Sequence, residues 1–274
     1  MWEPLYFLAK RGMMVEKREK RHFMELTVKS FLIVCPMLFL AGFVDAIGGG
    51  GGLISLPAYL LAGLPVHQTI ATNKLSSTCG TALATGKFLK EGLVNWHLAL
   101  PAVAVAILGS SLGANLSLVA DPAVLEKVLF IVLPVVAFVV LNPRLFHDNP
   151  PREADRRTVV VSVVSAFLVG IYDGFYGPGT GTFLIIAFTL LAGMDMASAN
   201  AQTKVINLTT NITSLVIFLK NGQVVIPLGL AAAACNMVGN YLGASLALTR
   251  GSRITRPVIL VVLALLFLKV LGIL

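Results

Sequence analysis

The stretch Gly42-Phe-Val-Asp-Ala-Ile-Gly-Gly-Gly-Gly-Gly52 decides the fold, because it ends an apolar segment with a carboxylate and five consecutive glycines. A related stretch, Gly170-Ile-Tyr-Asp-Gly-Phe-Tyr-Gly-Pro-Gly-Thr-Gly181, lies in the second half of the chain. Glycine runs of this kind break a helix. Broken helices that carry charge inside apolar sequence are typical of the binding sites of membrane transporters.

The spacing of other residues indicates an internal repeat. Lys204 follows Lys74 by 130 positions. The same offset joins Gly49 to Gly179, Lys90 to Lys220, Gly92 to Gly222, Gly109 to Gly239 and Gly113 to Gly243. Asp173 follows Asp45 by 128 positions, which predicts a two-residue insertion in the second glycine loop.

The composition predicts a protein that resides in a lipid bilayer. Hydrophobic residues make up 57% of the 274 residues, charged residues only 12%, and the mean hydropathy is +0.86. Such a chain has too little polar surface for a soluble globule. The net charge of +8 lies in short basic runs between apolar segments, so it indicates membrane topology and not nucleic-acid binding. The cysteines lie singly, and no metal or cofactor site is predicted.

Apolar segments define the expected fold, since a membrane-spanning helix needs roughly 20 residues. Candidate spans cover residues 30–47, 70–89, 98–119, 128–141, 159–171, 197–219, 224–248 and 258–274. The apolar segments 53–62 and 183–192 are too short to cross, so we expect half-helices that begin at backbone breaks. The predicted fold is an all-α polytopic membrane protein. About eight transmembrane helices would form two internal repeats, each with a glycine-rich broken or half-helix.

The expected organisation has four parts. They are a basic cytoplasmic tail at 1–29, a first membrane half at 30–143, a polar linker at 144–157 and a second membrane half at 158–274. The apolar stretch after the tail continues past Gly42, which argues against a cleaved signal peptide. Four crossings per half would make the repeats parallel and an odd number would invert them; sequence alone leaves both open.

The glycine loops are the first candidate site. Backbone without side chains can present N–H groups to an anion, and the helix that follows adds the positive end of its dipole. The predicted loop residues are Gly49, Gly50 and Gly51 in the first half and Gly179, Thr180 and Gly181 in the second. For the Gly-xxx-Gly pairs at 109/113 and 239/243, close helix packing is the favoured interpretation.

Each half also carries a polar stripe at helical spacing. The first stripe comprises Asn73, Lys74, Ser77 and Thr81, and the second comprises Thr203, Lys204, Asn207 and Asn211. We expect both stripes to face a common centre, where the lysines would balance the charge of an anion. The alternative is that each lysine lies near a helix end and extends to the membrane interface.

Asp45 and Asp173 lie just before the glycine breaks. They could take up and release protons during transport, or they could be structural, either capping the half-helix or pairing with Lys74 and Lys204. The structural interpretation is favoured, because a bare carboxylate would repel an anion. Weaker candidates for the cavity wall, which could equally be interhelical hydrogen-bond partners, are Ser110, Ser111, Asn115, Tyr172, Tyr176, Asn236 and Asn240.

These motifs resemble the TauE/SafE family, the sulfite exporter or toluene-sulfonate uptake permeases. The most specific parts are Gly48-Gly-Gly-Gly-Gly-Leu-Ile-Ser-Leu-Pro57, Ala71-Thr-Asn-Lys-Leu-Ser76, the stretch 172–181, and Gln202-Thr-Lys204. The resemblance implies about eight transmembrane helices that arose by duplication and residence in the bacterial inner membrane. It also implies transport of small sulfur-containing or organic anions such as sulfite, sulfoacetate or sulfonates.

The sequence therefore predicts a multi-pass secondary transporter whose partners are a small anionic solute and the lipid bilayer, with no nucleic acid. No ATP-binding P-loop is present, so an ion gradient, the membrane potential or the gradient of the solute would drive transport. An anion channel is the alternative. An intramembrane enzyme is disfavoured, because the chain has no HExxH motif and no paired-carboxylate spacing.

Overall fold

The computed structural model describes residues 28–125, 127, 149–150 and 154–250, and all regular structure within them is helical. The first half contains α2 (Val28–Gly48), α3 (Gly52–Leu61), α4 (Val66–Lys90) and α5 (Trp96–Val119). The second contains α7 (Arg156–Phe175), α8 (Thr180–Ile186), the π-helix η2 (Ala187–Leu191), α9 (Met196–Lys220) and α10 (Ile226–Arg250). The predicted segments 128–141 and 258–274, nearly all of the tail and part of the linker lie outside the described residues.

Local sequence sets the ends of the long helices. Asn95, Asp155 and Asp195 are the N-cap residues of α5, α7 and α9, and each side chain accepts an N–H of the first turn. Helices α4 and α9 are followed by Gly92 and Gly222, with φ of +69° and +65°. Glycine occupies this left-handed conformation without a Cβ clash, so it stops both helices at equivalent positions.

The two glycine stretches interrupt the helical structure as expected. Gly49 and Gly50 have φ of +76° and +89° between α2 and α3. Gly177 and Gly179 have φ of +97° and +83° between α7 and α8. The short helices predicted at 53–62 and 183–192 are confirmed as α3 and as α8 continued by η2, although the second finishes in π-helical geometry.

Three of the described helices, α2, α5 and α7, are long and apolar enough to cross a membrane. Helices α4, α9 and α10 are 25 residues long, but they do not meet the same hydropathy criterion. In α4 and α9 the polar stripe lowers the mean hydropathy. Many residues of this stripe are buried inside the protein. Their polarity therefore faces other helices.

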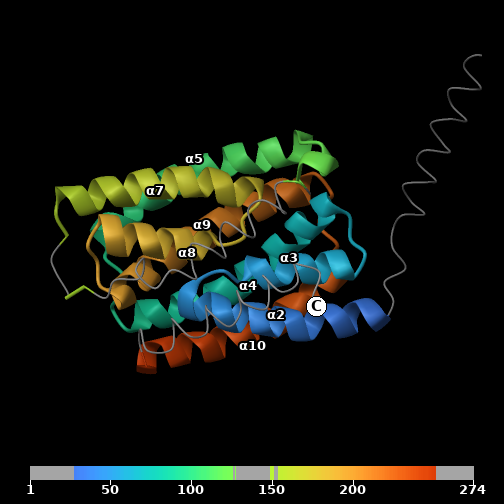
Figure 1. The fold of residues 1–274 in the computed structure, drawn as a ribbon, viewed down its shortest axis with the longest axis horizontal. Coiled ribbons are helices and arrows are strands. Elements are labelled where there is room, and N and C mark those ends of the chain that lie inside the picture. Colours follow the sequence, from blue (N-terminus) through green and yellow to red (C-terminus); the bar gives the residue numbers. More distant parts are fainter. Residues whose placement is uncertain (1–27, 126, 128–148, 151–153, 251–274) are drawn as a thin grey trace, which may run out of the picture.

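Helices from different halves of the sequence form the closest pairs: α2 packs on α10 and α5 packs on α7 (Figure 1). A Cβ at Gly239 or Gly243 would clash with carbonyl oxygens of α2, and one at Gly109 or Gly113 with carbonyl oxygens of α7. The four glycines thus allow backbone-to-backbone contact, which confirms the close-packing interpretation.

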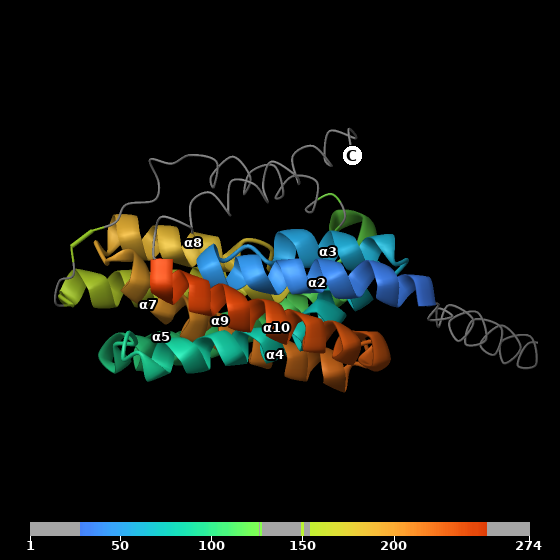
Figure 2. The ribbon, with the colours of Figure 1, turned by 90° about the horizontal axis from the view of Figure 1, so that it is seen from below.

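The helices form two bundles, which we name by their first members. The α2 bundle comprises α2, α3, α4 and α10, and the α7 bundle comprises α5, α7, α8 with η2, and α9. Helices α4 and α9 meet between them and run antiparallel, since Lys74 contacts Asn211 and Thr85 contacts Lys204. The short helices α3 and α8 extend toward opposite ends of the molecule (Figures 1 and 2). The two glycine loops consequently meet in the middle.

Candidate functional site

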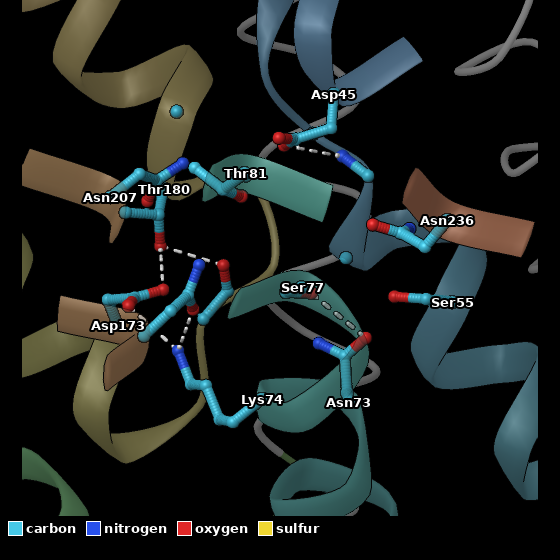
Figure 3. Close-up of a pocket in the computed structure, with 17 residues that line it drawn as sticks. Asp45, Ser55, Asn73, Lys74, Ser77, Thr81, Asp173, Thr180, Asn207 and Asn236 are labelled. Carbon is cyan, nitrogen blue, oxygen red and sulfur yellow. Dashed lines mark hydrogen bonds and ion pairs between the residues drawn. The ribbon is translucent and has the colours of Figure 1, made fainter. Parts of the chain in front are cut away.

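A small cavity lies where the two glycine loops and the two polar stripes converge (Figure 3). Its volume is about 30 Å³, and both bundles contribute to its wall. The α2 bundle contributes Asp45, Gly50, Gly51, Gly52, Ser55, Asn73, Lys74, Ser77, Thr81 and Asn236. The α7 bundle contributes Asp173, Gly177, Gly179, Thr180, Gly181, Asn207 and Asn211.

The structure thus places most of the residues singled out by sequence around one space. Among the predicted glycine-loop, polar-stripe and aspartate residues, three do not line it: Gly49, Thr203 and Lys204. Thr203 and Lys204 are fully buried behind the wall. Gly49 lies at the crossing of the loops, where a Cβ at Gly181 would be 2.8 Å from its Cα. Its contribution is therefore close contact between the two loops.

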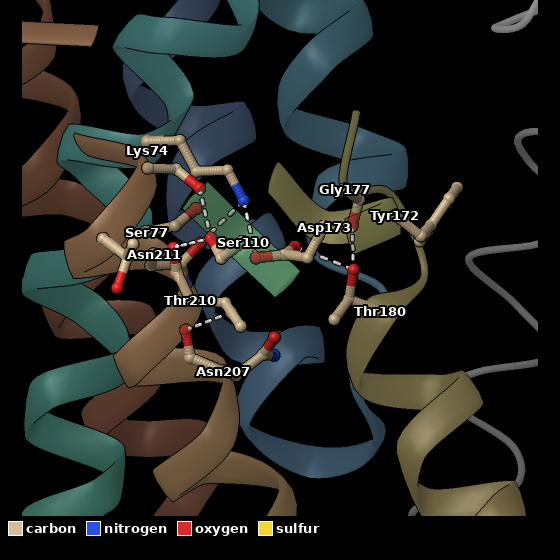
Figure 4. Close-up of polar contacts among 12 residues, drawn as sticks. Lys74, Ser77, Ser110, Tyr172, Asp173, Gly177, Thr180, Asn207, Thr210 and Asn211 are labelled. Carbon is tan, nitrogen blue, oxygen red and sulfur yellow. Dashed lines mark hydrogen bonds and ion pairs between the residues drawn. The ribbon is translucent and has the colours of Figure 1, made fainter. Parts of the chain in front are cut away.

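Lys74 forms an ion pair with an aspartate of the other half. Its Nζ lies 2.7 Å from Oδ2 of Asp173 and donates a second hydrogen bond, of 3.1 Å, to Oδ1 of Asn211 (Figure 4). The other carboxylate oxygen of Asp173 accepts a hydrogen bond of 2.8 Å from the Thr180 hydroxyl. Both charged side chains are almost fully buried and line the cavity.

Lys204 forms the reciprocal pair with Asp45. Its Nζ lies 2.9 Å from Oδ2 of Asp45 and also donates to the backbone carbonyl of that residue. The Asp45 side chain is 17% exposed, whereas Lys204 is fully buried. Oδ1 of Asp45 accepts a long hydrogen bond of 3.4 Å from the backbone N–H of Gly51. The two pairs therefore differ in their surroundings.

Both ion pairs bridge the two bundles, since Lys74 and Asp45 belong to the α2 bundle and their partners to the α7 bundle. Pairing compensates three buried charges, and the partly exposed Asp45, that would otherwise be costly in a low dielectric. Neither lysine extends to the surface, which rules out the interfacial alternative in this structure. The two ion pairs carry no net charge, so hydrogen-bond donors at the cavity must stabilise any negative charge on a solute.

Several other polar residues hold helices together. Ser110 of α5 donates to the Thr210 carbonyl at 2.8 Å and shares a 2.7 Å hydrogen bond with Ser214 of α9. The Tyr172 hydroxyl bonds the Pro178 carbonyl within the second loop. Of the weaker candidates from sequence, Asn236 lines the cavity, and its Oδ1 accepts a 2.9 Å hydrogen bond from Asn240.

Ser55 is a cavity residue that the sequence does not single out. It lies in the first turn of α3, is 1% exposed, and its hydroxyl has no hydrogen-bond partner among the described residues. Figure 3 shows the hydroxyl directed into the polar cluster. A lone serine in an apolar segment resembles any small residue, and only its position three residues after the glycine run distinguishes it.

Long apolar helices around a buried, charged cavity define a multi-pass membrane protein of the transporter class. The family described as "Sulfite exporter TauE/SafE" matches residues 34–270, and the chain belongs to that family. It is 34% identical over 244 residues to "Probable membrane transporter protein ORF9" of Sinorhizobium sp, covering 89% of this chain and 92% of that one.

Two further relatives carry similar names. A "Probable membrane transporter protein" of Haemophilus influenzae is 35% identical over 239 residues, covering 87% of this chain and 93% of the relative. "Probable membrane transporter protein YfcA" of Escherichia coli is 33% identical over 254 residues, covering 89% and 94% of the two chains. No solved structure matches the chain.

Proposed function

We propose that this chain is a secondary carrier for a small sulfur-containing or organic oxyanion, of the sulfite, sulfoacetate or sulfonate class, in the bacterial inner membrane. The observation that carries the proposal is the cavity between the bundles, lined by two glycine loops and two polar stripes. The name of the family and the bacterial origin of the relatives support the cargo class and the membrane.

The two membrane halves, 30–143 and 158–274, form an inverted repeat in this proposal. Equivalent lysines lie 130 positions apart, and the helices that carry them run antiparallel. Inversion gives a carrier two related states, each open to one side of the membrane.

The moving bodies are the bundles, not the sequence halves, because each bundle includes one helix of the other half. Both ion pairs lie across the interface between the bundles, so they hold it closed in this structure. Rocking of one bundle against the other would open the cavity to either side and requires these contacts to rearrange.

The cargo would be held by hydrogen-bond donors that the ion pairs leave free. An ammonium group has three N–H donors, and Lys74 uses two of them for Asp173 and Asn211. The third is available to an oxygen of the cargo. Gly50, Gly51 and Gly52 place backbone close to the same space, as anion sites at helix N-termini do.

The volume of the cavity favours the smallest members of this cargo class. A single water molecule needs about 10–15 Å³ on the same measure, so 30 Å³ admits a solute of a few atoms. Sulfite suits this space better than an extended sulfonate does.

The test is ligand-dependent thermal stability of the purified full chain against sulfite, thiosulfate, sulfoacetate, a sulfonate and acetate. We expect sulfite to raise the melting temperature in a saturable way. Lys74→Gln should remove the shift, while Lys87→Gln, outside this cavity, should retain it. No shift with any oxyanion, or an equal shift with Lys74→Gln, would overturn the proposal.

A further inference from the structure

The buried hydroxyl of Ser55 is the starting observation. Buried hydroxyls in native proteins nearly always have a hydrogen-bond partner, because an unmet donor loses its interaction with water. Ser55 Oγ has none among the described residues, yet it is buried and lines the cavity. A partner that binds in the cavity accounts for it.

The equivalent positions of the second half differ in a consistent way. Position 185, which is 130 residues after Ser55, holds an isoleucine that does not line the cavity. Position 180, equivalent to Gly50, holds a threonine whose hydroxyl donates to Asp173 at 2.8 Å. The second loop thus offers its carboxylate a hydroxyl donor, whereas the first loop has no side-chain donor and offers Asp45 only the backbone N–H of Gly51, at 3.4 Å.

The residues around Ser55 form a set of donors on one side of the cavity. Helix α3 is ten residues long, and the positive end of its dipole lies at Gly51 and Gly52. Asn73 lines the same wall, and its Oδ1 accepts a 3.4 Å hydrogen bond from Ser77. The amide NH₂ of Asn73 is then oriented as a donor.

We infer that the oxygens of the cargo bind in an oxyanion subsite at the N-terminus of α3, formed by the Ser55 hydroxyl, the Asn73 amide and the loop backbone of Gly50–Gly52. This inference rests on the proposed function and places the anion toward the α2 bundle instead of midway between the bundles. Ser55 is then the residue that selects an oxyanion, because no other described residue satisfies its hydroxyl.

The experiment measures sulfite affinity of the full-length protein with Ser55→Ala and, as a matched control, Ser162→Ala. Ser162 is also buried with no hydrogen-bond partner in the described part of the chain, but it lies on α7 outside the cavity. We expect Ser55→Ala to weaken sulfite binding about 10- to 100-fold, the effect of one hydrogen bond to a charged group. Ser162→Ala should bind like the wild type.

The melting temperature without ligand separates binding from folding. Since Ser55 Oγ makes no hydrogen bond to any residue that the structure describes, Ser55→Ala should melt like the wild type. Ser55→Thr, which keeps the hydroxyl, should restore most of the affinity. Wild-type affinity in Ser55→Ala, or a drop matched by Ser162→Ala, would overturn the subsite and leave the carrier intact. A wild-type protein that binds no oxyanion would overturn both.

Discussion

Lys74 of the first half and Asp173 of the second are joined by a 2.7 Å contact between Nζ and Oδ2, buried at the interface of the two bundles. The reciprocal pair, Lys204 with Asp45, has a distance of 2.9 Å. Each lysine therefore neutralises the aspartate of the opposite half. The two ion pairs therefore link the bundles at two points beside the cavity in which we place the cargo.

The pairing can be tested by a double-mutant cycle. Lys74→Gln leaves the Asp173 carboxylate buried without its cation, and we expect it to lower the free energy of unfolding by about 3–5 kcal/mol. Adding Asp173→Asn removes the second charge, so the double variant should recover much of that loss. Denaturant unfolding in detergent measures all three variants.

The mismatched combination of Lys74→Gln with Asp45→Asn is the control for this cycle. It leaves two unpaired charges in separate pairs, so the two losses should add. Equal recovery of the free energy of unfolding in the matched and mismatched double variants would mean that Lys74 does not pair specifically with Asp173.

The relative orientation of the halves predicts a labelling pattern. Glu91 and Asn221 are equivalent exposed residues directly after α4 and α9, which run antiparallel. In a variant without native cysteines, Glu91→Cys and Asn221→Cys should react with a membrane-impermeant maleimide from opposite sides of a vesicle. Labelling of both from the same side would show that the repeats are parallel.

Packing of α2 on α10 predicts a cross-link between native cysteines. Cys35 in α2 and Cys235 in α10 are neighbours at the contact between these two helices. A short bifunctional thiol reagent should join them, so that a chain cleaved within 144–157 still migrates as one piece under denaturing conditions. Cys35→Ser should abolish the link. Separate fragments from a protein in which both thiols react singly would contradict this packing.

The crossing of the glycine loops predicts a contrast between two glycines. Gly49 has φ of +76°, and a Cβ there would clash with the backbone of Thr182. Gly49→Ala should therefore destabilise the protein by more than the roughly 1–2 kcal/mol of the left-handed conformation alone. Gly86 lies in α4, where an added Cβ would have no neighbour within 4 Å among the described residues, so Gly86→Ala should stabilise by about 0.5–1 kcal/mol. Thermal unfolding that ranks the two alike would argue against the contact.

Much of this arrangement could be predicted from sequence, because its signals are local. Glycine runs break helices wherever they lie, and polar residues at helical spacing must share a face. Asn73, Lys74, Asn207 and Asn211 accordingly surround one cavity.

Other features depend on contacts between distant parts of the chain. Which aspartate pairs with which lysine depends on how the two bundles meet, and no local pattern encodes it. The same packing places Lys204 behind the cavity wall although its equivalent Lys74 lines it. Sequence reasoning could not identify Ser55, because the lack of a hydrogen-bond partner depends on the residues that surround it in the folded protein.

Counterflow in proteoliposomes tests the carrier most directly. Vesicles loaded with unlabelled sulfite should take up labelled sulfite transiently against its gradient, and the rate should saturate with concentration. Unloaded vesicles and Lys74→Gln vesicles should show no such uptake. A sulfite current that rises linearly with voltage, without counterflow, would contradict the alternating-access carrier.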